Sequence, residues 1–175
     1  AGTQNGGLLR IDPSTRGVAA LTTIDGSQNS ITSNSIKSIL VDKTGKIWVG
    51  SREKGVSLYD PVDNTFRRFQ HDDAVTSSLS SNNVTGLHQD SNGGIWIGTS
   101  EGLNQYMPSE HTFRIYNSSN SGLPSNTISS IYQSQEGAYW IGTTLGLAYG
   151  TKALFPLWDR ISNNLSSNSV NCFAE

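Results

Sequence analysis

Short apolar stretches alternate with polar turns along the whole chain, and this pattern predicts β-strands rather than long helices. In the clearest stretch, the predicted strands cover residues 35–41, 47–51, 56–59 and 65–69. Each strand is bounded by Gly, Pro, Asn or Asp, which favour turns. Asp60-Pro61 ends the third strand, because proline has no N–H to donate to a sheet. The sequence therefore predicts four short antiparallel strands joined by tight turns.

The first strand of this set departs from strict alternation of apolar and polar residues. Its apolar residues lie three positions apart, and the same spacing returns twice later in the chain. The pairs are Ile36 and Ile39, Val84 and Leu87, and Ile128 and Ile131. A β-bulge would produce this spacing, and a helical turn is the competing interpretation. Because turn signals recur throughout each period, we favour the strand.

The whole pattern repeats along the chain. Each copy holds an Asn before its first strand, an Asp-x-x-Gly turn, and a Trp-Ile/Val-Gly-Ser/Thr core, although Ser134 replaces the Asp in the third copy. The tryptophans of these cores are Trp48, Trp96 and Trp140, which lie 48 and then 44 residues apart. A period in the forties is typical of a β-propeller, whose blades are sheets of four antiparallel strands.

Fragments of the same pattern lie near both ends of the chain. Gly2-Thr3 matches Gly50-Ser51, and Asn168 stands where a fourth copy would begin. We therefore expect an all-β chain in which residues 1–175 form part of one β-propeller domain, as a piece of a longer propeller. The expected full blades are about 31–78, 79–122 and 123–164, and the expected partial blades are 1–30 and 165–175.

The repeated tryptophans are expected to pack between neighbouring blades. Burying ~200 Å² of aromatic surface at ~25 cal/mol/Å² contributes up to about 5 kcal/mol. A platform on which sugar rings stack is the alternative interpretation. An aromatic residue that recurs in every blade favours packing.

The sequence predicts no metal site and no cofactor. The Asp-x-x-Gly turns suggest calcium, but 42–45 lacks the alternating oxygen ligands and the distal Glu of a calcium loop. The histidines, His71, His88 and His111, show no ligand spacing. The single cysteine, Cys172, has no second cysteine with which to form a disulfide or a metal cluster. We therefore interpret the Asp-x-x-Gly segments as ordinary turns.

Composition narrows the function classes. Twelve Lys and Arg against 14 Asp and Glu give a net charge of −2, so no basic surface attracts a nucleic-acid backbone or an anionic membrane. Charged residues make up only 15% of the chain, so uncharged polar residues keep its surface soluble. No stretch approaches the ~20 apolar residues of a membrane span. No nucleophile elbow, phosphate loop or dinucleotide motif is present, and the sequence indicates no catalytic residue.

Ligand-binding residues are expected where the copies differ. In a propeller, the loops between the second and third strands lie on the same face as the blade-to-blade connections. The first such loop carries an extra residue and three charges, Arg52, Glu53 and Lys54. Together with Glu101 of the second loop, they are the candidate residues for binding a small polar ligand near the central channel. The alternative is that these side chains are charged only because loop tips face water.

The repeated pattern, with Leu-Ser/Pro-Ser-Asn-x-Val/Ile before Asp-x-x-Gly-x-Ile-Trp-Ile-Gly-Thr and Gly-Leu, closely resembles the two-component regulator propeller repeat. The resemblance implies the periplasmic sensor region of an inner-membrane receptor whose output is a histidine kinase or a diguanylate cyclase. It implies an oligosaccharide or another small polar ligand. The implied partners are the rest of the propeller and receptor, including a receptor homodimer. The sensor segment itself would not be an enzyme.

Two other function classes stay open. A protein-interaction scaffold is the second interpretation, because propellers carry unrelated functions on one frame. A carbohydrate-active enzyme is the third, and it would need an acid and a base carboxylate about 5–9.5 Å apart. Turnover of a polysaccharide would favour the enzyme, and copurification with a protein partner would favour the scaffold.

Overall fold

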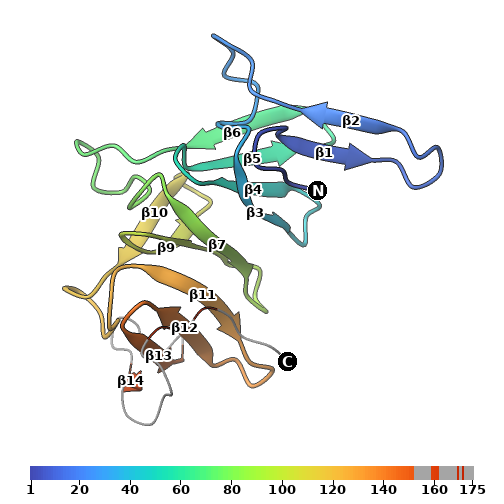
Figure 1. Cartoon of the computed structure of the whole chain (residues 1–175). Coiled ribbons are helices and arrows are strands. Elements are labelled where there is room, and N and C mark those ends of the chain that lie inside the picture. The colour runs from blue at the N-terminus through green and yellow to red at the C-terminus, as the bar shows by residue number, and fades with distance from the viewer. Residues whose placement is uncertain (152–158, 162–168, 170, 172–175) are drawn as a thin grey trace.

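The computed structural model describes residues 1–151, 159–161, 169 and 171 of the 175-residue chain. These residues contain strands, turns and bends and no helix, so the expected all-β class is confirmed. A two-stranded sheet precedes three four-stranded antiparallel sheets that follow one another along the chain (Figure 1). The short first sheet consists of β1 (Leu8–Ile11) and β2 (Val18–Leu21).

Each four-stranded sheet is an up-and-down blade in which neighbours in the chain are neighbours in the sheet. The first contains β3 (Ile36–Val41), β4 (Ile47–Ser51), β5 (Val56–Asp60) and β6 (Thr65–Phe69). The second contains β7 (Val84–Gln89), β8 (Ile95–Thr99), β9 (Gly102–Met107) and β10 (Thr112–Tyr116). The third contains β11 (Ile128–Gln133), β12 (Tyr139–Thr143), β13 (Gly146–Gly150) and β14 (Asp159–Ile161). The first strands β3, β7 and β11 contact one another in order, as the inner strands of a propeller do.

The strand bounds agree closely with the sequence pattern. The predicted strands 47–51 and 65–69 are observed without change, while 35–41 begins one residue later and 56–59 ends one residue later. The partial blade expected at 1–30 contains the β1–β2 hairpin. The partial blade expected at 165–175, with Asn168 and Cys172, lies outside the described residues apart from two positions.

The unusual apolar spacing of the first strands is produced by β-bulges. The register shifts between Ile36 and Ser38 in β3, and β7 and β11 shift at the equivalent places. The extra residue lets apolar side chains three positions apart point to the same side. The interpretation as a bulge is therefore confirmed, and the helical turn is wrong.

The repeated Asn residues connect each blade to the preceding chain. The Oδ1 of Asn34 accepts a hydrogen bond from Thr23 N at 2.9 Å, and the Oδ1 of Asn82 accepts one from His71 N at 2.8 Å. Asn126 makes the same bond with Ser118 N. One amide side chain thus fixes the chain where it passes from an outer strand to the next inner strand.

Trp48 and Trp96 pack between neighbouring blades, as predicted. Their side chains are 2% and 0% exposed, so neither ring is open for stacking with a sugar. The Trp48 ring centroid lies 4.8 Å from that of Tyr106, and the Trp96 centroid lies 5.3 Å from that of Tyr139. We call the interface between the β3–β6 and β7–β10 sheets the first seam, and that between the β7–β10 and β11–β14 sheets the second seam. Trp140 is only half-buried.

The Asp-x-x-Gly segments are turns whose carboxylate also holds the tryptophan. Asp42 Oδ1 accepts hydrogen bonds from the Thr44 and Lys46 N–H groups, and Asp42 Oδ2 accepts one from Trp48 Nε1 at 2.9 Å. Asp90 is bonded to its own turn and to Trp96 in the same way. The turn is confirmed, and it also fixes the orientation of the indole.

Close approach across the second seam explains the glycine that follows Trp-Ile. A Cβ at Gly98 would lie 2.8 Å from Ile128 Cγ2 of the next sheet, whereas a Cβ at Gly86 would meet nothing within 4 Å. We expect Gly98→Ala to lower the free energy of unfolding by about 1–3 kcal/mol through overpacking. Gly86→Ala, also in a strand, should change it by less than about 0.5 kcal/mol. Urea denaturation of both variants tests this, and equal losses would contradict it.

Candidate ligand-binding face

The turns between the second and third strands of the blades lie together at one end of the sheets. Each donates a backbone hydrogen bond to the residue just before an inner strand, as Ser100 N does to Asn83 O at 3.1 Å. The equivalent bonds are Arg52 N to Ser35 O and Thr144 N to Thr127 O. We call this end the loop face, defined by residues 33–35, 51–55, 81–83, 99–102, 125–127 and 143–146.

The four predicted binding residues all lie on the loop face. Arg52, Glu53 and Lys54 share the β4–β5 turn, and Glu101 lies in the β8–β9 turn of the next blade; all four are exposed. Their backbone is fixed, since Lys54 N donates to Ser51 Oγ and Glu101 N donates to Thr99 Oγ1. Among the described residues no ion pair joins these four side chains. The structure therefore brings three together on one turn and leaves Glu101 on its neighbour.

A row of hydroxyl groups completes the loop face, and sequence analysis did not identify it. Ser81 Oγ lies 2.9 Å from Ser100 Oγ, and Ser125 Oγ lies 3.0 Å from Thr144 Oγ1. In the first blade Arg52 occupies the position of Ser100, so a guanidinium replaces the second hydroxyl. The face thus presents paired hydroxyls beside one turn with three charged side chains.

The sequence did contain a sign of these hydroxyl groups. A serine directly precedes the repeated Asn in every full copy, at Ser33, Ser81 and Ser125. Each of these hydroxyls also accepts the N–H two residues further on, as Ser33 Oγ does from Ser35 N at 3.0 Å. The repetition pointed to a structural role. The second hydroxyl that lies beside Ser81 and beside Ser125 is evident only from the tertiary structure.

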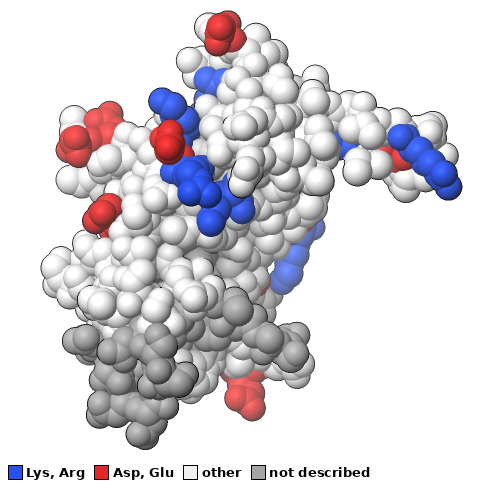
Figure 2. All heavy atoms as spheres, viewed as in Figure 1, with Lys and Arg blue, Asp and Glu red and all other residues white. Residues whose placement is uncertain are grey.

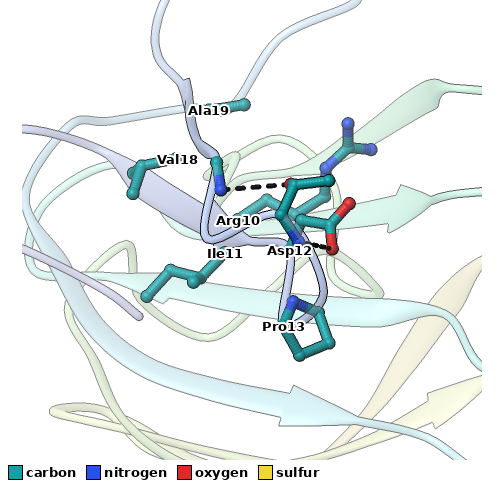
Figure 3. A pocket seen from close by; sticks show the side chains of 8 residues that line it. Arg10, Ile11, Asp12, Pro13, Val18 and Ala19 are labelled. Atoms are coloured by element: carbon teal, nitrogen blue, oxygen red, sulfur yellow. Dashed lines mark hydrogen bonds between the residues drawn. The ribbon is translucent and has the colours of Figure 1, made fainter.

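The best-formed cavities among the described residues lie away from the loop face. A cavity of about 490 Å³ lies instead against the β1–β2 hairpin, and its lining comes from that hairpin alone (Figure 3). Its carboxylate belongs to Asp12, which accepts hydrogen bonds from Ser14 and Thr15. These bonds lower the pKa of Asp12 to about 2. The carboxylate therefore stabilises its own turn, and the residues that line the cavity all come from one hairpin.

In the described ranges no group of three or more His, Cys, Asp or Glu is placed to hold a metal ion. The Leu79 carbonyl and the Asp73 carboxylate raise the pKa of His71. Burial lowers the pKa of His88, which lies in β7 as predicted.

Figure 2 shows a surface on which most atoms belong to uncharged residues, which matches the low fraction of charged residues in the chain.

Comparison with protein families identifies the repeat. Residues 30–53, 78–101 and 122–144 each match the family described as two component regulator propeller. Each matched segment contains the capping Asn, the bulged inner strand, the turn and the Trp-containing strand. No curated protein sequence matches the chain.

Solved structures share the fold at low sequence identity. The extracellular domain of a protein described as a hybrid two component system of B. thetaiotaomicron aligns with a TM-score of 0.80 and 20% identity, over 98% of this chain and 26% of that one. A second extracellular domain from the same organism, described as a one component system, gives 0.65 and 19%, over 97% and 30%. Virginiamycin B lyase from Staphylococcus aureus gives 0.65 and 11%, over 94% and 51%. The chain thus spans between about a quarter and a half of these proteins.

Proposed function

We propose that the chain is a ligand-sensing segment of a β-propeller in a signal-transduction receptor, because its three repeats match the two-component regulator propeller family. It binds a small polar ligand such as an oligosaccharide, and the receptor passes the signal to a cytoplasmic output domain. The loop face, with Arg52, Glu53, Lys54 and Glu101, is the proposed contact surface.

The observation that supports this proposal most directly is the chemistry of the loop face. Paired hydroxyls such as Ser81 with Ser100 can both donate and accept hydrogen bonds, as sugar hydroxyls do. Arg52 adds a cation that forms the stronger, charge-assisted bonds. The backbone beneath these groups is tied to the inner strands, so they are held in place before a ligand arrives.

The receptor context supplies the proposed location and partners. The similar domains of B. thetaiotaomicron are described as extracellular, and we propose the periplasm for this segment, as part of the ectodomain of an inner-membrane receptor. Its proposed partners are the remainder of the propeller, the receptor, and a second receptor copy. In the part of the chain that the structure describes, no helix is long and apolar enough to cross a membrane.

An enzymatic role is the weaker alternative. The lyase shares the propeller fold at 11% identity, and similarity at that level carries the fold without the chemistry. A protein-interaction scaffold is the other alternative. Each alternative predicts a result that a sensor would not give. An enzyme would turn over a substrate, and a scaffold would copurify with a protein partner.

We expect Arg52→Ala and Lys54→Ala each to weaken oligosaccharide binding by about tenfold or more, because each loses a charge-assisted hydrogen bond. Arg10→Ala, which removes one exposed cation from the β1–β2 hairpin, is the matched control and should bind normally. Isothermal titration with a panel of neutral and acidic oligosaccharides measures all three. Unchanged affinity in both loop variants would exclude the loop face, and a panel without any binder would exclude the ligand class.

A further inference from the structure

His88 places an imidazole ring in the second seam. It lies in β7 directly opposite Trp96 of β8, and two residues paired in this way point their side chains to the same face of a sheet. Trp96 belongs to the apolar cluster of the second seam. The next sheet begins with β11, which contacts both β7 and β8 (Figure 1). The ring of His88 therefore points into the space between the second and third blades.

One ring nitrogen of His88 is buried without a partner. No described residue forms a hydrogen bond with its Nε2 atom. A neutral imidazole carries one N–H group, whereas the protonated ring carries an N–H on both nitrogens. Protonation therefore places a charged donor on Nε2 where no acceptor faces it, which is costly inside a protein. Burial accordingly lowers the pKa of His88, although the nearby carboxylate of Asp90 opposes that effect.

The first seam has a leucine at the equivalent place. Leu40 of β3 is paired with Trp48 of β4, as His88 is with Trp96. Leu40 packs against the apolar cluster of the first seam. An apolar side chain thus fits this position of a blade, and it cannot take up a proton. The two seams share one architecture and differ here in whether the side chain can become charged.

The other titratable side chains of the second seam keep their charge near neutral pH. The hydrogen bonds of Asp90 bring its pKa below 3.8, so its carboxylate stays ionised. Burial raises the pKa values of Tyr116 in β10 and Tyr139 in β12, so both phenols stay neutral. Arg114, which interacts with Tyr116, is always a cation, and β11 presents two isoleucines to the seam. Among the described side chains of this seam, His88 is thus the one whose charge can change between about pH 5 and pH 8.

We propose that the second seam is a pH-sensitive contact between blades. When the pH falls below neutrality, protonation of His88 weakens the packing of the second blade on the third, and the first seam keeps its packing. The weakening reaches the loop face, because Thr127 Oγ1 donates a hydrogen bond to Ser100 O at 3.1 Å across the second seam. The response of the seam does not depend on whether the loop face binds a sugar, so this inference stands apart from the proposed function.

Comparison with His88→Leu, which places the residue of the first seam in the second, tests the proposal. The unfolded chain takes up a proton at His88 below about pH 6.5, whereas the folded protein resists it, so stability is full above that pH and falls in acid. Relative to His88→Leu, the unfolding equilibrium constant of the wild type should rise about threefold or more between about pH 8 and pH 5, with a limit of about thirtyfold. Urea denaturation measures this rise, and the comparison cancels the other titrating groups. A rise below about threefold overturns the proposal.

The NMR signals of two indole N–H groups place the response in one seam. The Trp96 signal of the wild type should shift over the same pH range, and this shift should disappear in His88→Leu. The Trp48 signal should respond to pH equally in both proteins, because the first seam is unchanged. Leu40→His should add a pH response at Trp48, and the Trp96 comparison still decides if that variant does not fold. A Trp96 shift that is absent in the wild type or survives in His88→Leu, or a folded Leu40→His protein without the added response, would overturn the proposal.

Discussion

Replacing Trp96 by alanine is expected to lower the free energy of unfolding by about 3–5 kcal/mol. The indole is 0% exposed and belongs to the apolar cluster of the second seam, with Leu103, Ile128 and Ile141. Truncation leaves a cavity between two sheets that are held together mainly by side chains. It also removes the Nε1–H donor from the buried carboxylate of Asp90. The two effects act on the same interface.

Urea denaturation followed by circular dichroism measures this loss. Trp96→Phe keeps much of the apolar volume and loses the N–H donor, so we expect it to fall between the wild type and alanine. Val62→Ala is the control for truncation at a surface position, since Val62 is 90% exposed, and should stay within about 0.5 kcal/mol. A loss below about 1 kcal/mol for Trp96→Ala would show that the seam is not a well-packed core.

Asp90→Asn is expected to lower the free energy of unfolding by about 2–4 kcal/mol. The carboxylate of Asp90 accepts hydrogen bonds from the Asn92 and Gly94 N–H groups, from Trp96 Nε1 and from the Tyr139 hydroxyl. An amide offers one oxygen and turns an NH₂ group toward two of these donors. The hydrogen bonds that those two donors make to the carboxylate are then lost from a buried site, and each loss costs about 1–3 kcal/mol.

The same carboxylate should make stability depend on acid. Burial raises the pKa of Asp90, but the hydrogen bonds from Trp96, Tyr139, Gly94 and Asn92 outweigh that effect and bring the pKa below 3.8. A carboxyl group with a lower pKa in the folded state stabilises the fold above its unfolded pKa, near 3.9. That contribution is lost as the pH falls through the folded pKa. Asp90→Asn should therefore be less sensitive than the wild type to acid below about pH 4.

Asp42→Asn is the matched control for both measurements. Asp42 holds the equivalent turn and Trp48, but it is half-buried and no tyrosine donates to it. We therefore expect a smaller loss than for Asp90→Asn. Equal losses for the two variants would show that the bond from Tyr139 contributes nothing measurable. Tyr139→Phe then isolates that bond, because it removes only the hydroxyl.

Local features of the fold were predictable because they depend on near neighbours in the chain. The strand 47–51 follows from its apolar run between two turn signals, and the bulge in β3 follows from the spacing of Ile36 and Ile39. The turn at 42–45 follows from the Asp-x-x-Gly pattern. The burial of Trp48 and Trp96 follows from repetition, because an aromatic residue required in every blade is required for packing.

The candidate site was predicted only in its charged part. The sequence placed Arg52, Glu53, Lys54 and Glu101 on turns at one end of the blades, and the structure has them there. It did not reveal that hydroxyls of two different segments meet, as Ser81 and Ser100 do across 19 positions of the chain. Such a pair depends on where two turns pass each other, and no local pattern encodes that distance.

By itself, then, the sequence determined the all-β class, the blade repeat, and which residues belong to buried strands and which to turns. These features depend on the spacing of apolar residues and on turn-forming residues, which act within a few positions of the chain. The tertiary structure decided what the seams contain. Asp90 and Tyr139 are 49 positions apart, and their hydrogen bond exists only because two sheets pack with one relative offset. At the equivalent place Ile95 is too short to make it, and a cavity remains. Which side chain reaches the turn carboxylate across a seam is settled by how the two sheets pack.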